Sequence, residues 1–93
     1  MHQTRSSAKL LAADGIRVNC VIPGSTVFPG GIWDRVSQTD PTLYETTRDR
    51  IPLGRLAVPE DIAKVVFFQV SPDAGWITGQ SIVVDGGQAL VGS

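Results

Sequence analysis

The chain contains one cysteine, Cys20, and one histidine, His2, among its 93 residues. A single cysteine cannot form an internal disulfide, and these two side chains cannot assemble a Cys/His metal cluster. The sequence therefore predicts no metal site and gives no sign of an oxidising compartment, so a cytoplasmic location is expected. No run approaches the roughly 20 apolar residues that span a bilayer, and the first residues lack the apolar core of a signal peptide. Membrane association is not expected.

Basic residues are too few and too scattered to predict a nucleic-acid-binding surface. The chain has 8 basic and 9 acidic residues, for a net charge of -1, and no block of positive charge that would neutralise a run of phosphates. Hydrophobic residues make up 42% of the chain and charged residues 18%, which is typical of a chain that buries a core. A length of 93 residues gives room for one small domain only.

The common catalytic and phosphate-binding motifs are also missing. None of the ten glycines has G-x-G-x-x-G spacing, and neither a Walker motif nor G-x-S-x-G occurs. Cys20 falls inside an apolar run, where a thiol usually packs, and Tyr44 has Arg48 rather than a lysine one turn later. Glu60 and Asp61 stand where acids complement a helix dipole. The sequence therefore predicts no catalytic residue in this chain.

The first part of the chain predicts a helix followed by a strand. The pattern from Met1 to about Ala13 is helical, and Gly15 can adopt the left-handed conformation that ends helices. Ile16 to Ile22 is rich in β-branched residues and stops at Pro23. Its second half is apolar on both faces, which indicates a parallel strand covered on both sides.

A long segment, residues 23–58, separates this strand from the next regular element. It predicts two short helices, one over Ile32 to Val36 and one with Asp40 as N-cap and Pro41 as its first residue. Segments this long are commonly lids or binding loops, and a plain surface excursion that covers the sheet edge is the alternative. The residue pattern leaves both interpretations open.

The last third predicts a second helix and strand. Pro59 opens a helix that runs to about Val70, and Ser81 to Asp85 reads as another buried strand. Phe67 and Phe68 widen the apolar arc of this helix beyond what one sheet covers, so a second contact surface is expected. The order helix, strand, long connection, helix, strand indicates α/β topology with a parallel crossover.

Several motifs, in order and at this spacing, closely resemble the C-terminal part of the classical short-chain dehydrogenase/reductase family. They are Asp14–Gly24, Pro52–Leu56, Pro59–Ala63 and Ile77–Gly87. The resemblance implies an α/β fold that is the C-terminal portion of a Rossmann-like doubly wound parallel sheet: its last two strands, their crossover helix and a substrate-lid segment. Residues 1–93 would then be a single partial domain, with residues 25–50 as the lid.

The resemblance also implies a cofactor, NAD or NADP. Pro23 and Gly24 match the turn that passes over the nicotinamide end, and the Thr26 backbone matches the position that contacts the carboxamide. Ligands of parallel sheets do bind outside the carboxyl ends of the strands. Two positions depart from the family pattern. Phe28 replaces a threonine that reaches the cofactor phosphates, and Val58 replaces a helix-capping threonine.

Relative to the family, the glycine-rich turn and the catalytic Ser, Tyr and Lys would lie upstream of Met1. The expectation is therefore a chain that does not turn over a carbonyl/alcohol substrate alone. A homo-oligomer, or association with a full-length relative, is also expected. Two alternatives remain open at this point: a non-catalytic module that binds a full-length relative, and a non-functional remnant. A two-stranded sheet with an open edge further predicts an isolated chain that is partly molten or prone to aggregate.

Overall fold

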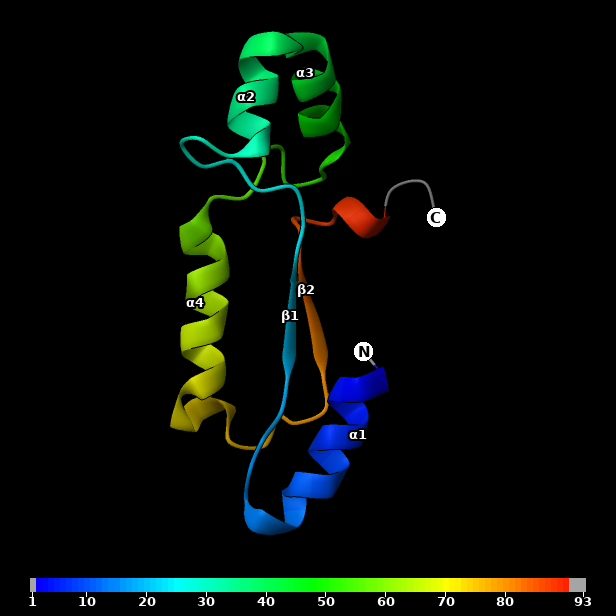
Figure 1. Cartoon of the computed structure of the whole chain (residues 1–93), viewed down its shortest axis with the longest axis vertical. Helices are drawn as coiled ribbons and strands as arrows, with labels where there is room; N and C mark the ends of the chain where they lie inside the picture. Colours follow the sequence, from blue (N-terminus) through cyan, green and yellow to red (C-terminus); the bar gives the residue numbers. More distant parts are fainter. Residues whose placement is uncertain (1, 91–93) are drawn as a thin grey trace.

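The computed structural model describes residues 2–90 as a mixed α/β arrangement. The chain runs from a helix into a strand, then through a helical hairpin and one further long helix to a second strand (Figure 1). Its elements in chain order are α1 (His2–Leu11), η1 (Ala12–Asp14), β1 (Cys20–Pro23), α2 (Ile32–Thr39), α3 (Pro41–Arg50), α4 (Pro59–Val70), η2 (Pro72–Ala74), β2 (Ser81–Val84) and η3 (Gln88–Leu90).

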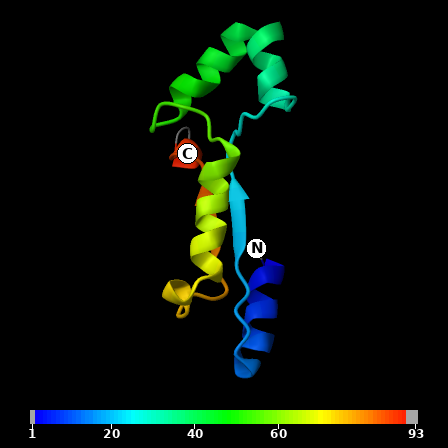
Figure 2. The same cartoon turned by 90° about the vertical axis from the view of Figure 1, so that its left-hand side faces the viewer.

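The two strands are adjacent and parallel, as the sequence predicts. Cys20 lies opposite Ser81, and the register continues to Pro23 opposite Val84. Helix α4 runs alongside both strands, the α2–α3 hairpin lies beyond their carboxyl ends, and α1 lies near their amino ends (Figures 1 and 2). The segments that directly follow each strand therefore lie at the end of the molecule where the hairpin is (Figure 1).

Strand β1 is shorter than the predicted strand Ile16–Ile22. The first half of the predicted strand lies outside β1, because its backbone bonds to the loop before β2 instead of to β2 itself. The Val18 N–H donates to the Thr78 hydroxyl at 3.1 Å, and the Val18 carbonyl accepts from Gly79 N–H at 2.7 Å. The Asn19 side chain donates to the Ile77 carbonyl at 3.1 Å and accepts from Gln80 N–H at 3.0 Å. The prediction was also wrong by one residue at Asp85, which lies beyond β2.

Helix boundaries coincide with the glycine, proline and capping residues of the sequence. Gly15, at a φ of 73°, follows the 3-10 turn that closes the first helical segment. The Asp40 carboxylate accepts from Leu43 N–H at 3.2 Å, so Asp40 is the N-cap of α3 as predicted. Helix α4 has the predicted bounds. The helix predicted over Ile32–Val36 extends to Thr39, and Met1 lies outside the described residues.

The buried core is small for a chain of this length. Among the described residues, only small and medium side chains are buried, with Ala74 at 0% and Leu56 at 3% exposure. Phe67 is 74% exposed and Trp76 is fully exposed. The radius of gyration is 16.0 Å, compared with about 13 Å for a compact domain of about 100 residues. The fold thus leaves apolar surfaces uncovered.

Within residues 2–90, no helix is long and apolar enough to cross a membrane.

Candidate functional site

The candidate site lies at the carboxyl ends of the two strands, where residues 24–27 follow β1 and residues 85–88 follow β2. Gly24 continues the ladder for one more step, donating its N–H to the Val84 carbonyl at 3.0 Å. A Cβ on Gly24 would lie 2.5 Å from the Cβ of Asp85. Glycine is therefore required here, because the loop passes directly against Asp85, the residue that follows β2.

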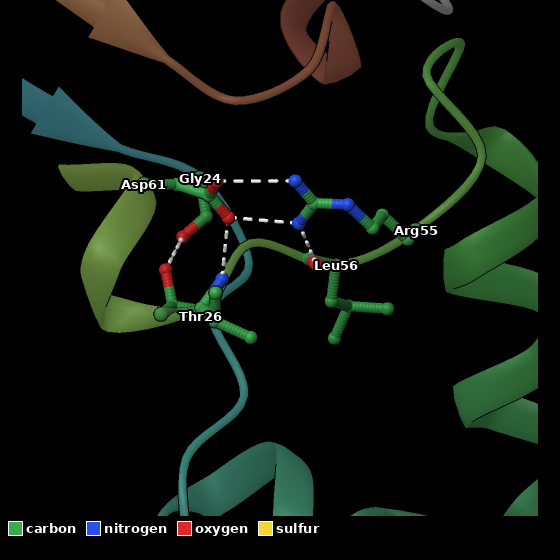
Figure 3. Close-up of polar contacts among 6 residues, drawn as sticks. Gly24, Thr26, Arg55, Leu56 and Asp61 are labelled. Carbon is green, nitrogen blue, oxygen red and sulfur yellow. Dashed lines mark hydrogen bonds and ion pairs between the residues drawn. The ribbon is translucent and has the colours of Figure 1, made fainter. Parts of the chain in front are cut away.

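Thr26 leaves this turn in an extended conformation and forms an isolated parallel bridge with Ala57. The Ala57 N–H donates to the Ser25 carbonyl at 3.0 Å, and the Val27 N–H donates to the Ala57 carbonyl at 2.8 Å. A trans peptide directs its C=O and N–H to opposite sides. The N–H and C=O of Thr26 itself therefore point away from Ala57, and they have no hydrogen-bond partner among residues 2–90. The Thr26 hydroxyl donates to the Gly24 carbonyl at 3.0 Å (Figure 3).

Ala57 is held in turn by an ion pair at the start of α4. The Arg55 guanidinium contacts both oxygens of Asp61, with Nη1–Oδ2 at 2.8 Å and Nη2–Oδ1 at 3.1 Å (Figure 3). Arg55 Nη1 also donates to the Leu56 carbonyl at 3.1 Å, and the Asp61 carboxylate accepts from Val58 N–H at 2.8 Å. The segment between Arg55 and the helix is therefore fixed at both ends.

The same contacts set the charge state of the pair. The hydrogen bond from Arg55 lowers the pKa of Asp61 far below its usual range, with a further contribution from the Val58 N–H. Asp61 in turn raises the pKa of Arg55. Both side chains are consequently charged near neutral pH. A carboxylate at the third residue of α4 also suits the positive end of the helix dipole.

The other side of the loop is held by Gln88, in the turn after β2. Its side-chain Oε1 accepts from Ser25 N–H at 3.0 Å, and its Nε2 donates to the Ser25 hydroxyl at 3.0 Å. The turn is itself ordered by Asp85, whose carboxylate accepts from Gly87 N–H at 2.9 Å and from Ala89 N–H at 2.8 Å. Residues 24–27 therefore lie between two well-bonded segments.

The structure brings together the three residues that the resemblance singles out. Pro23 ends β1, Gly24 contacts the end of β2, and Thr26 follows on the same loop. Phe28 lies slightly apart, because its ring packs over Gly31, where a Cβ would come within 2.7 Å of it. Next to the site is a cavity of about 210 Å³. It is lined by Leu53, Arg55, Ala57, Asp61, Val84, Asp85 and Gly86.

Sequence reasoning missed the side chain of Gln88 and the pairing of Thr26 with Ala57. No local pattern predicts either contact, because Gln88 is 63 residues from Ser25 and Ala57 is also distant in sequence from Thr26. The Arg55–Asp61 pair had a usable signal: an acid at the third position of a helix opened by proline, with an arginine just before it. Among the described residues, no group of three or more His, Cys, Asp or Glu could hold a metal ion.

Adjacent parallel strands with a glycine-containing loop across their carboxyl ends are the arrangement of nucleotide-binding α/β proteins. A family model described as Enoyl-(Acyl carrier protein) reductase matches residues 1–89. A crystal structure of an oxidoreductase of the short chain dehydrogenase/reductase family from Burkholderia thailandensis superposes with a TM-score of 0.83 at 32% identity, over 96% of this chain and 34% of that one.

Relatives in other organisms agree. Isoepoxydon dehydrogenase patN of Aspergillus clavatus is 43% identical over 77 residues, which is 83% of this chain and 30% of that protein. The 3-oxoacyl-acyl-carrier-protein reductase FabG of Thermotoga maritima is 40% identical over 87 residues, which is 94% of this chain and 33% of that protein. The chain belongs to the short-chain dehydrogenase/reductase family and shares its Rossmann-like fold. It spans about a third of the length of these relatives.

Proposed function

We propose that this chain forms the nicotinamide end of the cofactor pocket, and the substrate lid, of an NAD(P)-dependent oxidoreductase that acts on a carbonyl/alcohol pair. The observation that carries the proposal is the backbone of Thr26. Its N–H and C=O lie next to the carboxyl ends of two parallel strands. Ala57 bonds the neighbouring peptide groups, so that the N–H and C=O of Thr26 both point away from Ala57. Pro23 and Gly24 form the turn that leads to it.

The donor set fits a primary carboxamide. A carboxamide presents one NH₂ donor and one carbonyl acceptor, and one residue of extended backbone offers the complementary acceptor and donor. Two such bonds would fix the rotation of a nicotinamide ring, because they constrain the plane of its amide. The cofactor, when bound, supplies or accepts the hydride, and this chain's contribution is to orient the ring that carries it.

Residues 25–50 would form the lid over the substrate. Helices α2 and α3 pack as a hairpin beyond the strand ends (Figure 1), with the rings of Trp33 and Tyr44 in edge-to-face contact at 6.5 Å. The hairpin carries exposed apolar side chains, with Ile32 74% exposed and Leu43 46% exposed. Closing such a surface over a substrate would exclude water from the reacting carbonyl.

Proton transfer to the carbonyl oxygen would come from outside this chain. The family's proton donor is a tyrosine whose pKa is lowered by a lysine four residues later, and the sequence has no such pair. We therefore propose that the chain alone is inactive. Its function would depend on the remaining two thirds of a family protein.

A fusion protein tests this proposal. In it, the matching segment of the Thermotoga maritima reductase is replaced by residues 1–93 of this chain. We expect the fusion to oxidise NADH or NADPH with a 3-oxoacyl substrate, whereas the isolated chain does not. Exchange of the Thr26 amide with deuterium should slow when nicotinamide mononucleotide is added and should not change with adenosine monophosphate, which lacks the carboxamide.

Two results would contradict the proposal in different ways. A folded fusion that neither binds nor oxidises the cofactor would favour the remnant interpretation. An active fusion in which the Thr26 amide exchanges at the same rate with and without the mononucleotide would show that the carboxamide is held elsewhere.

We also propose that the exposed apolar side of α4 binds another chain, either a second copy or a full-length relative. Phe67 is 74% exposed and Phe68 is 48% exposed, with Val66 and Val70 also exposed on the same helix, and contiguous exposed apolar patches mark interaction surfaces. A non-catalytic module that binds a relative would use the same surface. Sedimentation of the isolated chain should show concentration-dependent association, and Phe67→Ser should weaken it. A cytoplasmic location is proposed from the single free Cys20.

A further inference from the structure

We infer that Gln88 is a positioning residue for the nicotinamide pocket: through Ser25, it sets where the Thr26 backbone lies. The inference deepens the proposed function and rests on it. Gln88 contacts Ser25 with both ends of its side-chain amide, through the backbone N–H at 3.0 Å and the hydroxyl at 3.0 Å. A primary amide that uses its acceptor and its donor on one residue fixes that residue's position and its orientation together.

The two neighbours of the loop have separate effects on Thr26. Ala57 sets the direction of its polar groups, because it bonds the peptide groups on both sides of Thr26. Those bonds connect Thr26 to the segment before α4, which the Arg55–Asp61 pair holds at the start of that helix. Gln88 ties Ser25 instead to the turn after β2. The bonds from Gln88 thereby fix the position of Ser25 relative to the carboxyl ends of the strands, where the proposed pocket lies.

The surroundings of Gln88 are arranged for this contact. Its backbone N–H donates to the Asp85 carbonyl at 3.1 Å, within a turn that the Asp85 carboxylate also orders. Its Oε1 lies over Gly24, so close that a Cβ on that glycine would be 2.9 Å away. The side chain is half-buried, so water competes only partly for its bonds to Ser25. The absence of a side chain at Gly24 thus leaves the space that the Gln88 amide occupies.

A positioning role and a merely stabilising role predict different measurements. If Gln88 only stabilises the fold, its removal lowers the melting temperature and leaves cofactor affinity in the folded protein unchanged. If it positions Thr26, its removal raises the KM for the cofactor, while kcat changes little at saturation, because the machinery for proton transfer lies elsewhere. Loss of hydrogen bonds of this kind corresponds to roughly a threefold to tenfold change in affinity.

The test uses the full chain within the fusion protein. Gln88→Met keeps the shape of the side chain and removes both bonds. It should raise the KM for NADH or NADPH about threefold to tenfold and speed exchange of the Ser25 amide by a similar factor. Gln88→Glu keeps an acceptor for the Ser25 N–H and a second for its hydroxyl, so it should return the KM to within about twofold of the parent. Gln3→Met, on the exposed surface of α1, is the matched control and should change neither quantity.

An unchanged KM in Gln88→Met, together with faster exchange at Ser25, would overturn the inference and leave Gln88 as a stabilising contact. Failure of the proposed function looks different, because the parent fusion itself would then show no cofactor dependence. Gln88 is judged in that case from amide exchange alone. Faster exchange of both the Ser25 and the Val27 amides in Gln88→Met supports positioning of the loop, because the Val27 N–H bonds to the Ala57 carbonyl, and unchanged exchange at Val27 overturns it.

Discussion

Arg55 and Asp61 meet through two parallel hydrogen bonds, at 2.8 and 3.1 Å, across the loop that precedes α4. Their contact joins the first turn of the helix to the segment that pairs with Thr26. It also makes the stability of this corner depend on pH. Arg55 is the largest cause of the lowered pKa of Asp61, and the Val58 N–H is the second.

The lowered pKa gives the sign of the pH dependence. A carboxylate whose pKa is lower in the folded state stabilises the fold above its ordinary pKa of about 3.9, and this contribution is lost as the pH falls further. We therefore expect Asp61→Asn to lower the melting temperature of the fusion protein at pH 7 and to matter less at pH 3. Asp73→Asn, on an exposed acid, is the control. A difference between parent and variant that grows on acidification would contradict this account.

Val58→Thr should stabilise the amino end of α4. Val58 is the N-cap and has the extended backbone of one, with φ -112° and ψ 160°, but its side chain offers no acceptor. A threonine hydroxyl there could accept from the Asp61 N–H, and an N-cap of this kind contributes about 0.5 to 2 kcal/mol. Thermal unfolding of the fusion protein measures the gain. Threonine has nearly the volume of valine, so the parent is the matched control for shape, and an equal melting temperature for the parent and Val58→Thr would rule out capping.

Arg17→Met should destabilise the amino ends of the strands. The Arg17 guanidinium donates to the Gln69 carbonyl at 2.6 Å and to the Ile77 carbonyl at 3.1 Å. The first of these is a carbonyl in the last turn of α4, which needs a donor from outside the helix. Losing two charge-assisted bonds should lower the free energy of unfolding by about 2 kcal/mol, measured by urea unfolding of the fusion protein. Arg5→Met, on the exposed side of α1, should change it by less than about 0.5 kcal/mol.

Gly24→Ala should be among the most damaging single changes in the loop. The added methyl would lie 2.5 Å from the Asp85 Cβ and 2.9 Å from its Cα, so the loop and the end of β2 must separate. Overpacking of this kind typically destabilises by about 1 to 3 kcal/mol. Gly75→Ala is the control, since its methyl would meet a single atom, the Pro72 carbonyl oxygen, at 3.0 Å. Equal losses in both variants would show that the close approach at Gly24 is not special.

The helices could be predicted where local chemistry decides them. Pro59 and the acids after it define the start of α4, and Asp40 with Pro41 defines α3, because caps and proline act within one turn. The strand boundaries were less accessible. Val18 has strand composition, but its backbone bonds to a threonine side chain and to a turn, and nothing in its own neighbourhood says so.

The site could be predicted only in part, for the same reason. A turn at Pro23 and Gly24 follows from the sequence, and the family resemblance predicts a cofactor contact for Thr26, which stays a prediction. The direction of the Thr26 polar groups depends on Ala57, and the position of the loop depends on Gln88, which is 63 residues from Ser25. Contacts of that range are set by the topology of the sheet, which a local pattern does not encode.

The parallel pairing of Cys20 with Ser81 also constrains how the protein is made. Residue 20 leaves the ribosome 61 residues before its partner, and synthesis at about 5 to 20 residues per second gives a wait of roughly 3 to 12 s. During this interval the apolar edge of β1 has no β2 to pair with, while α2 and α3 have already been synthesised. The helical hairpin can therefore form first, and the loop of residues 24–27 gains its bonds to Val84 and Gln88 only after those two residues have been synthesised.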